Sequence, residues 1–213
     1  MNRATKLNVG ILGAIFGISG MNHGFFEILQ GNIPTPNLFI FAIGEAQKMW
    51  VHGNEPAFTL IPNFLIAGIA AMVVGLAIIV WSFGFVQRKY GSIILFSLFI
   101  LLLLLGGGVA QILFFPWICL VSTRINKPLA WWQKVLPSKS LEPLAMFWRL
   151  SLIVSVTLLV VTLVIATTGF VPMVTDPEIV FSIMLICLGL EVIAFPLTFI
   201  TGYAYDLKRR GSK

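Results

Sequence analysis

The sequence predicts an all-α protein, a polytopic bundle of five or six membrane-crossing helices. Of its 213 residues, 58% are hydrophobic and only 10% are charged, whereas soluble domains carry about 25% charged residues. A helix needs about 20 apolar residues to cross a bilayer. Runs of at least that length recur at 7–29, 59–86, 92–123, 148–172 and 179–205. Lipid is therefore the expected solvent, and we predict one integral membrane domain over 1–213.

The first run begins like a signal peptide, because basic residues precede an apolar stretch. No small-x-small cleavage pattern follows, so we expect a retained first helix. Its glycines are spaced three and four residues apart, which places them in one stripe on a helix face: Gly10, Gly13, Gly17, Gly20 and Gly24. Stripes of this kind let a neighbouring helix approach closely in lipid. We predict that this glycine seam packs against another helix, and that it could also join a homo-oligomer or a partner membrane subunit.

The second run, 59–86, carries a smaller stripe of Gly68, Ala71 and Gly75 that could meet the first. The third run, 92–123, would make one helix of about 48 Å, but Gly106-Gly107-Gly108 interrupts it. It is therefore either one long broken helix or a short hairpin that turns at the glycines. The hairpin places thirteen of the fourteen Lys and Arg residues on one side, against ten for the single helix. The positive-inside rule favours the hairpin, whereas arms of about 16 residues are short for crossing.

Two loops separate the runs. Residues 30–58 form a long polar or interfacial loop, in which NLFIFAIGEAQKMW is expected to make a short interfacial helix. Residues 124–149 form a basic loop with Trp131 and Trp132, which we expect to lie on cytoplasmic membrane lipids. Both versions of the third run put this loop and the C-terminus in the cytoplasm, in a multi-pass protein of the cell membrane.

Glu27 and Glu191 are the strongest candidates for a functional site. Glu27 continues the spacing of the glycine seam and should face protein, with His23 one turn before it. Glu191 lies in the middle of the last run, on a stripe of small and polar residues. A charged residue at the centre of a membrane helix costs about 2.5–3.5 kcal/mol. We therefore predict that Glu27, Glu191 and His23 bind protons or cations, with a polar cap or a packing contact as the alternative.

Six further polar residues are possible partners of this site: Asn22, Asn63, Gln111, His52, Glu45 and Glu55. The His23–Glu27 spacing would also suit two metal ligands, but the HExxH pattern is absent, and no phosphate-binding or nucleophile motif occurs. We expect no catalytic residues, no metal and no cofactor. The net charge of +6 follows the ends of the apolar runs, which indicates membrane topology and no nucleic-acid partner.

These features favour a small cation- or proton-linked transporter or permeation protein that uses buried carboxylates. A non-catalytic membrane assembly or accessory subunit, held by the glycine seam, is the first alternative. The second is a membrane-embedded enzyme acting on a lipid or quinone, with His23 and Glu27 as acid and base.

Residues 22–64, together with GGGVAQILFF and STRINKPLAWW, resemble an uncharacterised family of prokaryotic multi-span membrane proteins. The likeness covers most of the chain. That family has no assigned activity, so the resemblance implies a bacterial or archaeal cell membrane and nothing about function.

Overall fold

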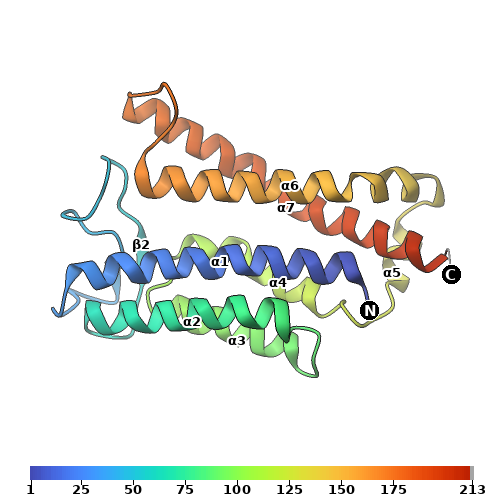
Figure 1. Ribbon diagram of the computed structural model, residues 1–213, viewed down its shortest axis with the longest axis horizontal. Helices are drawn as coiled ribbons and strands as arrows, with labels where there is room; N and C mark the ends of the chain where they lie inside the picture. The colour runs from blue at the N-terminus through green and yellow to red at the C-terminus, as the bar shows by residue number, and fades with distance from the viewer. Residues whose placement is uncertain (212–213) are drawn as a thin grey trace.

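The computed structural model describes residues 1–211 as a bundle of α-helices, which confirms the all-α prediction (Figure 1). Within the described residues, four helices are long and apolar enough to cross a membrane. They are α1 (Arg3–Gln30), α2 (Phe64–Gly84), α6 (Ser138–Thr168) and α7 (Pro177–Gly211). The chain is therefore a membrane-embedded protein, and its most extensive helix contacts join α1 to α2 and α6 to α7.

The glycine seam is an intramolecular contact between α1 and α2. A Cβ atom on Gly17 would lie 2.7 Å from the carbonyl oxygen of Gly75, and one on Gly24 would lie 2.6 Å from that of Gly68. Gly20 instead faces Leu102 of the next helix. All five seam glycines are buried within the chain. A homo-oligomer or a partner subunit stays a prediction, and it would need another surface.

Residues 92–123 fold back on themselves and do not form one long helix. They comprise most of α3 (Gly91–Leu104), the short 3-10 helix η1 (Ala110–Leu113) and α4 (Phe115–Ser122). The two arms lie side by side, with the rings of Phe99 and Phe115 stacked 5.3 Å apart. Because each arm is shorter than the roughly 20 residues that a crossing needs, the number of crossings stays a prediction.

The loop between α1 and α2 contains a β-hairpin, so the expected interfacial helix is wrong. Strand β1 (Phe39–Phe41) pairs antiparallel with β2 (Pro56–Phe58). Ile40 is buried while Phe39 and Phe41 are exposed, and this alternation with a period of two belongs to a strand. The backbone N–H of Gly106 donates to the carbonyl of Phe58 at 2.9 Å, which joins the glycine turn to this hairpin.

The basic loop predicted at 124–149 is shorter than expected, because α6 already begins at Ser138. Before it, the chain forms the short helix α5 (Ala130–Val135). Trp131 is exposed, whereas the ring of Trp132 lies 4.8 Å from that of Tyr203 on α7.

The two ends of the bundle differ in charge. Both termini lie at one end, and the β-hairpin lies at the other (Figure 1). We call the first the basic end, because Arg3, Arg124 and the Lys208–Arg210 run gather there with the termini. We call the second the acidic end: its segments 31–63 and 169–176 contain one Lys or Arg residue against three acidic ones. Asp206 holds the basic end together by accepting hydrogen bonds from the backbone N–H groups of Ala4 (3.0 Å) and Thr5 (2.9 Å).

Candidate functional site

Glu27 and His23 lie directly beneath the glycine turn at the acidic end. Glu27 is fully buried, and neither of its carboxylate oxygens has a hydrogen-bond partner within the described residues. The backbone of Gly106 lies against this carboxylate, and a Cβ on Gly108 would lie 2.6 Å from Cε1 of His23. Both glycines have positive φ angles, +101° and +94°, which residues with a side chain rarely adopt. The turn thus covers Glu27 and His23, and its backbone can lie this close to them only because these residues are glycines.

Glu55 connects His23 to the surface. Its Oε2 atom lies 3.9 Å from Nε2 of His23, and 22% of its side chain is exposed. Burial raises the pKa of Glu55 above the ordinary value for a glutamate. On the other side of the ring, Nδ1 of His23 has no hydrogen-bond partner within the described part of the chain. His23 therefore stands between a partly exposed carboxyl and the interior of the bundle.

A cavity of about 100 Å³ adjoins His23 and is large enough for a few water molecules. Its polar lining consists of Ser19, His23, Glu55, Gln111 and Thr162. Gln111 donates to the carbonyl of Gly107 in the glycine turn, whereas the Thr162 hydroxyl has no partner among the described residues. The cavity thus offers unpaired polar groups that water can bridge.

The loop over the cavity is fixed by an aromatic anchor. Trp50 Nε1 donates to the carbonyl of Ala166 on α6 at 2.9 Å, and its ring packs on Gly169, where α6 ends. Ala166 also lines the cavity. The residues between β1 and β2 are therefore attached to the wall of the cavity.

Glu191 lies in the interior between α6 and α7. It is fully buried, its Oε1 atom accepts a hydrogen bond from Ser155 Oγ at 2.5 Å, and its Oε2 atom has no partner in the described chain. Leu159 and Leu188 line the cavity and lie about one helical turn from Ser155 and Glu191 respectively. Leu159 and Leu188 therefore lie between Glu191 and the cavity along their two helices.

Glu27 and Glu191 have separate surroundings. Glu27 lies under the glycine turn, whereas the only hydrogen bond to Glu191 among the described residues comes from α6. Phe16 packs on Phe195 with ring centroids 6.2 Å apart, and Glu27 lies about 16 Å further along α1 than Phe16. The two carboxyls thus occupy different depths of the bundle.

Four groups of buried, hydrogen-bonded side chains lie between Glu191 and the basic end, and together we call them the polar ladder. The ladder consists of Ser155–Glu191, Ser151–Thr198–Thr201, Asn8–Trp148 and Thr5–Asp206. Ser151 Oγ and Thr201 Oγ1 are 2.7 Å apart.

Asn8 of α1 joins α6 and α7 within the ladder. Its Nδ2 donates to the carbonyl of Thr198 at 2.9 Å, and its Oδ1 accepts from Trp148 Nε1 at 2.9 Å. At the basic end, Thr5 Oγ1 donates to Asp206 Oδ2 at 2.8 Å. The ladder is therefore built by three helices, α1, α6 and α7.

Sequence reasoning missed most of the ladder. Trp148, Ser151, Ser155 and Thr162 are spaced three, four and seven residues apart, so they share a face of α6. This spacing was available as a signal. Asp206 gave no comparable signal, because it stands next to a basic tail and resembles an ordinary solvated charge.

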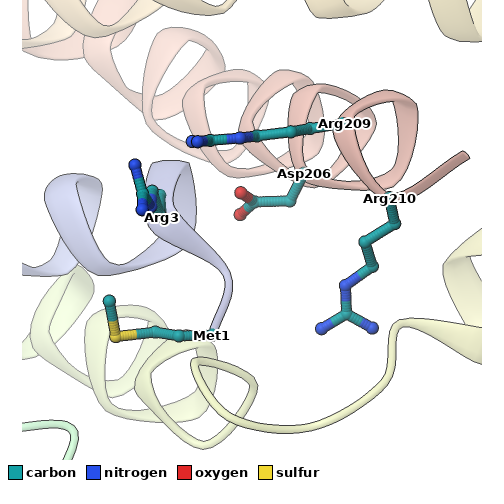
Figure 2. Close-up of a pocket in the computed structure, with 5 residues that line it drawn as sticks. All are labelled: Met1, Arg3, Asp206, Arg209 and Arg210. Atoms are coloured by element: carbon teal, nitrogen blue, oxygen red, sulfur yellow. The ribbon is translucent and has the colours of Figure 1, made fainter. Parts of the chain in front are cut away.

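A second cavity of about 300 Å³ adjoins the ladder at the basic end. It is lined by Met1, Arg3, Asp206, Arg209 and Arg210 (Figure 2). The polar ladder therefore runs between a small cavity near the acidic end and a larger one at the basic end.

The other predicted partners are distributed over the acidic end. Glu55 and Gln111 join His23 at the cavity. Asn22 instead donates to Thr167 Oγ1 at 3.1 Å. Asn63 caps α2 by accepting from the N–H of Ile66 at 3.1 Å. These two amides therefore bind helix ends and neighbouring helices, outside the cavity.

His52 and Glu45 lie on the surface of the loop. His52 Nε2 is 2.8 Å from Oε1 of Glu178 at the start of α7. Glu45 pairs with Lys48 Nζ at 2.5 Å and accepts from Asn54. These hydrogen bonds lower the pKa of Glu45. Neither residue lines the small cavity.

No family model, curated protein or solved structure matches this chain. The resemblance of residues 22–64 to an uncharacterised membrane family stays an expectation. The function is therefore inferred from the geometry of the cavities and the ladder.

Proposed function

We propose that the protein carries protons across a membrane, along a path from Glu55 and His23 through Glu191 to Asp206. The observation that supports this most directly is the polar ladder, whose four groups of hydrogen-bonded side chains are spaced between Glu191 and Asp206 inside an otherwise apolar bundle. Intramembrane carboxyls that face a bundle interior are typical of proton relays. Glu191 would take up and release the proton in the middle of the path.

The close packing of the ladder favours a proton over a metal cation. Its hydrogen bonds, such as the 2.7 Å contact between Ser151 and Thr201, leave no room between partners for a larger ion. A proton could pass between the hydroxyl and carboxyl groups of the ladder through single water molecules that enter between them, whereas a hydrated cation needs an open pore. We therefore narrow the expected cation- or proton-linked activity to protons.

Leu159 and Leu188 give the proposed path a gate. They separate the cavity from Ser155 and Glu191 by about one helical turn. An apolar constriction of this kind blocks transfer until water enters it. The structure would then correspond to a closed path that opens when the two leucines move apart.

Helix packing is the competing role for the ladder. Hydrogen bonds between membrane helices stabilise a bundle by about 0.6 kcal/mol each on average. Hydroxyls and amides would suffice for that purpose, as at Ser151, Thr201 and Asn8. A carboxyl with one oxygen unpaired, as at Glu191, adds a burial cost without a packing gain. This uncompensated cost of burying Glu191 favours a role in proton binding over a role in helix packing alone.

We expect Glu191→Gln to reduce protein-dependent proton flux by about tenfold or more, equivalent to a barrier increase of about 1.4 kcal/mol. Glutamine keeps the shape and an acceptor for Ser155 but cannot release a proton. Flux is measured with a pH-sensitive dye inside proteoliposomes, driven by a potassium diffusion potential. Glu178→Gln is the matched control, because Glu178 is exposed on the same helix.

The Leu159→Ser variant tests the gate in the same assay. A hydroxyl at this position would link Ser155 to Thr162, and flux should rise. The proposed path is wrong if liposomes that contain the wild-type protein or either variant all conduct protons no faster than empty liposomes. It is also wrong if the Glu191→Gln protein remains folded and conducts protons like the wild type.

The orientation of the proposed path in the membrane is expected from the distribution of charge between the two ends of the bundle. The positive-inside rule would place the basic end in the cytoplasm and the acidic end outside.

This orientation is tested with a cysteine introduced for Lys89, in the exposed turn between α2 and α3. In intact cells an impermeant maleimide should not label this cysteine, whereas it should do so once the membrane has been opened. Labelling from outside in intact cells would reverse the orientation.

A further inference from the structure

We propose that the cavity at the basic end binds a phosphate group, carried by an anionic phospholipid or by a soluble phosphate ester. The cavity has a volume of about 300 Å³, which exceeds the size of a phosphate group and leaves room for the glycerol attached to it. Its lining brings the first residues of α1 together with the last turn of α7 (Figure 2).

Charge is the first argument for an anion. Three arginines line the cavity, against one carboxylate, that of Asp206. That carboxylate already accepts three hydrogen bonds from the start of α1, two from backbone N–H groups and one from Thr5 Oγ1. The described lining therefore carries more arginine than carboxylate groups. Guanidinium groups match the geometry of phosphate oxygens and bind them with two parallel hydrogen bonds.

Preorganisation is the second argument. Arg210 is held in place because its Nη2 atom donates to Asn2 Oδ1 at 2.7 Å. Asn2 is itself bound through its backbone N–H to the carbonyl of Ile125 at 2.7 Å. In Figure 2, the side chains of Arg3 and Arg209 end on the side of Asp206 to which its carboxylate points, whereas Arg210 extends away from them. Arg210 is thus placed by the fold and needs little ordering when an anion binds.

Position is the third argument. The cavity lies at the ends of two helices that are long and apolar enough to cross a membrane. Arg3 is exposed, and α1 becomes continuously apolar only after Asn8. A phosphate bound here would lie at the depth of lipid headgroups, where basic residues attract anionic lipids. A soluble phosphate ester would reach the same guanidinium groups from the aqueous side.

Binding is tested on the purified full-length chain in a neutral detergent, with two probes. Dihexanoylphosphatidylglycerol represents the lipid source and glycerol 3-phosphate the soluble one, while zwitterionic dihexanoylphosphatidylcholine is the lipid control. Saturable binding is followed by the shift in melting temperature. We expect Arg3→Gln to weaken it about tenfold or more, because a charge-assisted hydrogen bond contributes about 1.5–3 kcal/mol. The affinity of the Arg3→Lys protein should lie between those of the wild type and the Arg3→Gln protein.

Arg149→Gln is the matched control, because Arg149 is an exposed arginine of α6 outside the cavity. Arg3-dependent binding of the phosphatidylglycerol alone identifies a lipid site, and Arg3-dependent binding of glycerol 3-phosphate identifies a soluble ligand. Absence of saturable binding, or binding that Arg3→Gln and Arg210→Gln leave unchanged, overturns the proposal. Because the readout is binding, its failure is distinct from failure of the proton path, although Asp206 borders both.

Discussion

Gly17→Leu should destabilise the bundle by about 3 kcal/mol or more, at the upper end of the cost of overpacking. A Cβ on Gly17 would lie 2.7 Å from the carbonyl oxygen of Gly75 and equally close to the Ile79 side chain. A backbone oxygen cannot move away as a flexible side chain can. The helices α1 and α2 would have to separate along the glycine seam, losing contacts that no hydrophobic effect restores in lipid.

The measurement is the thermal unfolding of the purified protein in detergent, together with its elution profile. Gly189→Leu makes the same change in α7, where a Cβ would meet nothing within 4 Å, and it should be close to neutral. A Gly17→Leu protein that melts within a degree or two of the wild type would contradict the α1–α2 contact described above.

Gly106→Ala should strongly destabilise the packing at the acidic end. Its φ of +101° is strained for any residue with a side chain, at a cost of about 1–3 kcal/mol. The added Cβ would also collide with the carboxylate of Glu27, and overpacking adds about 1–3 kcal/mol more. We therefore expect a large loss of thermal stability and displacement of the glycine turn from His23 and Glu27.

Gly31→Ala separates the two contributions. Gly31 has a φ of +90°, but a Cβ there would meet nothing within 4 Å, so that variant should show backbone strain alone. Adding Glu27→Ala to Gly106→Ala should recover the crowding cost, because the colliding group is gone, and the two changes should be non-additive. Equal melting temperatures for Gly31→Ala and Gly106→Ala would mean that the turn does not press on Glu27.

The faces of the helices could be predicted from the sequence, because helical spacing is a local property. The rhythm from Gly10 to Gly24 predicted a buried stripe that includes Glu27, and both the stripe and Glu27 are buried. The spacing around Glu191 likewise placed it inside, and it is fully buried. Spacing alone could not say which helix covers each stripe, and the depth of each carboxyl followed only from the packing.

Contacts between distant segments could not be predicted. Asp206 and Thr5 are separated by 201 residues, and Asp206 is followed by a basic tail typical of a solvated surface. The β-hairpin was missed because NLFIFAIG has only three strand residues, too few to separate a period of two from a helical pattern. The sequence predicted that the chain could turn at the three glycines, but it gave no sign that the backbone of this turn lies against Glu27.

The attachment of the first helix to the last constrains how the protein is assembled during synthesis. The backbone N–H groups of Ala4 and Thr5 are made 202 and 201 residues before their acceptor, Asp206. The pairs α1–α2 and α6–α7 can each form soon after insertion, because their members are near in sequence. The contact between α1 and α7 can form only after Asp206 has been synthesised, so a nascent chain truncated before Asp206 would hold two helical hairpins without the hydrogen bonds that join the first helix to the last.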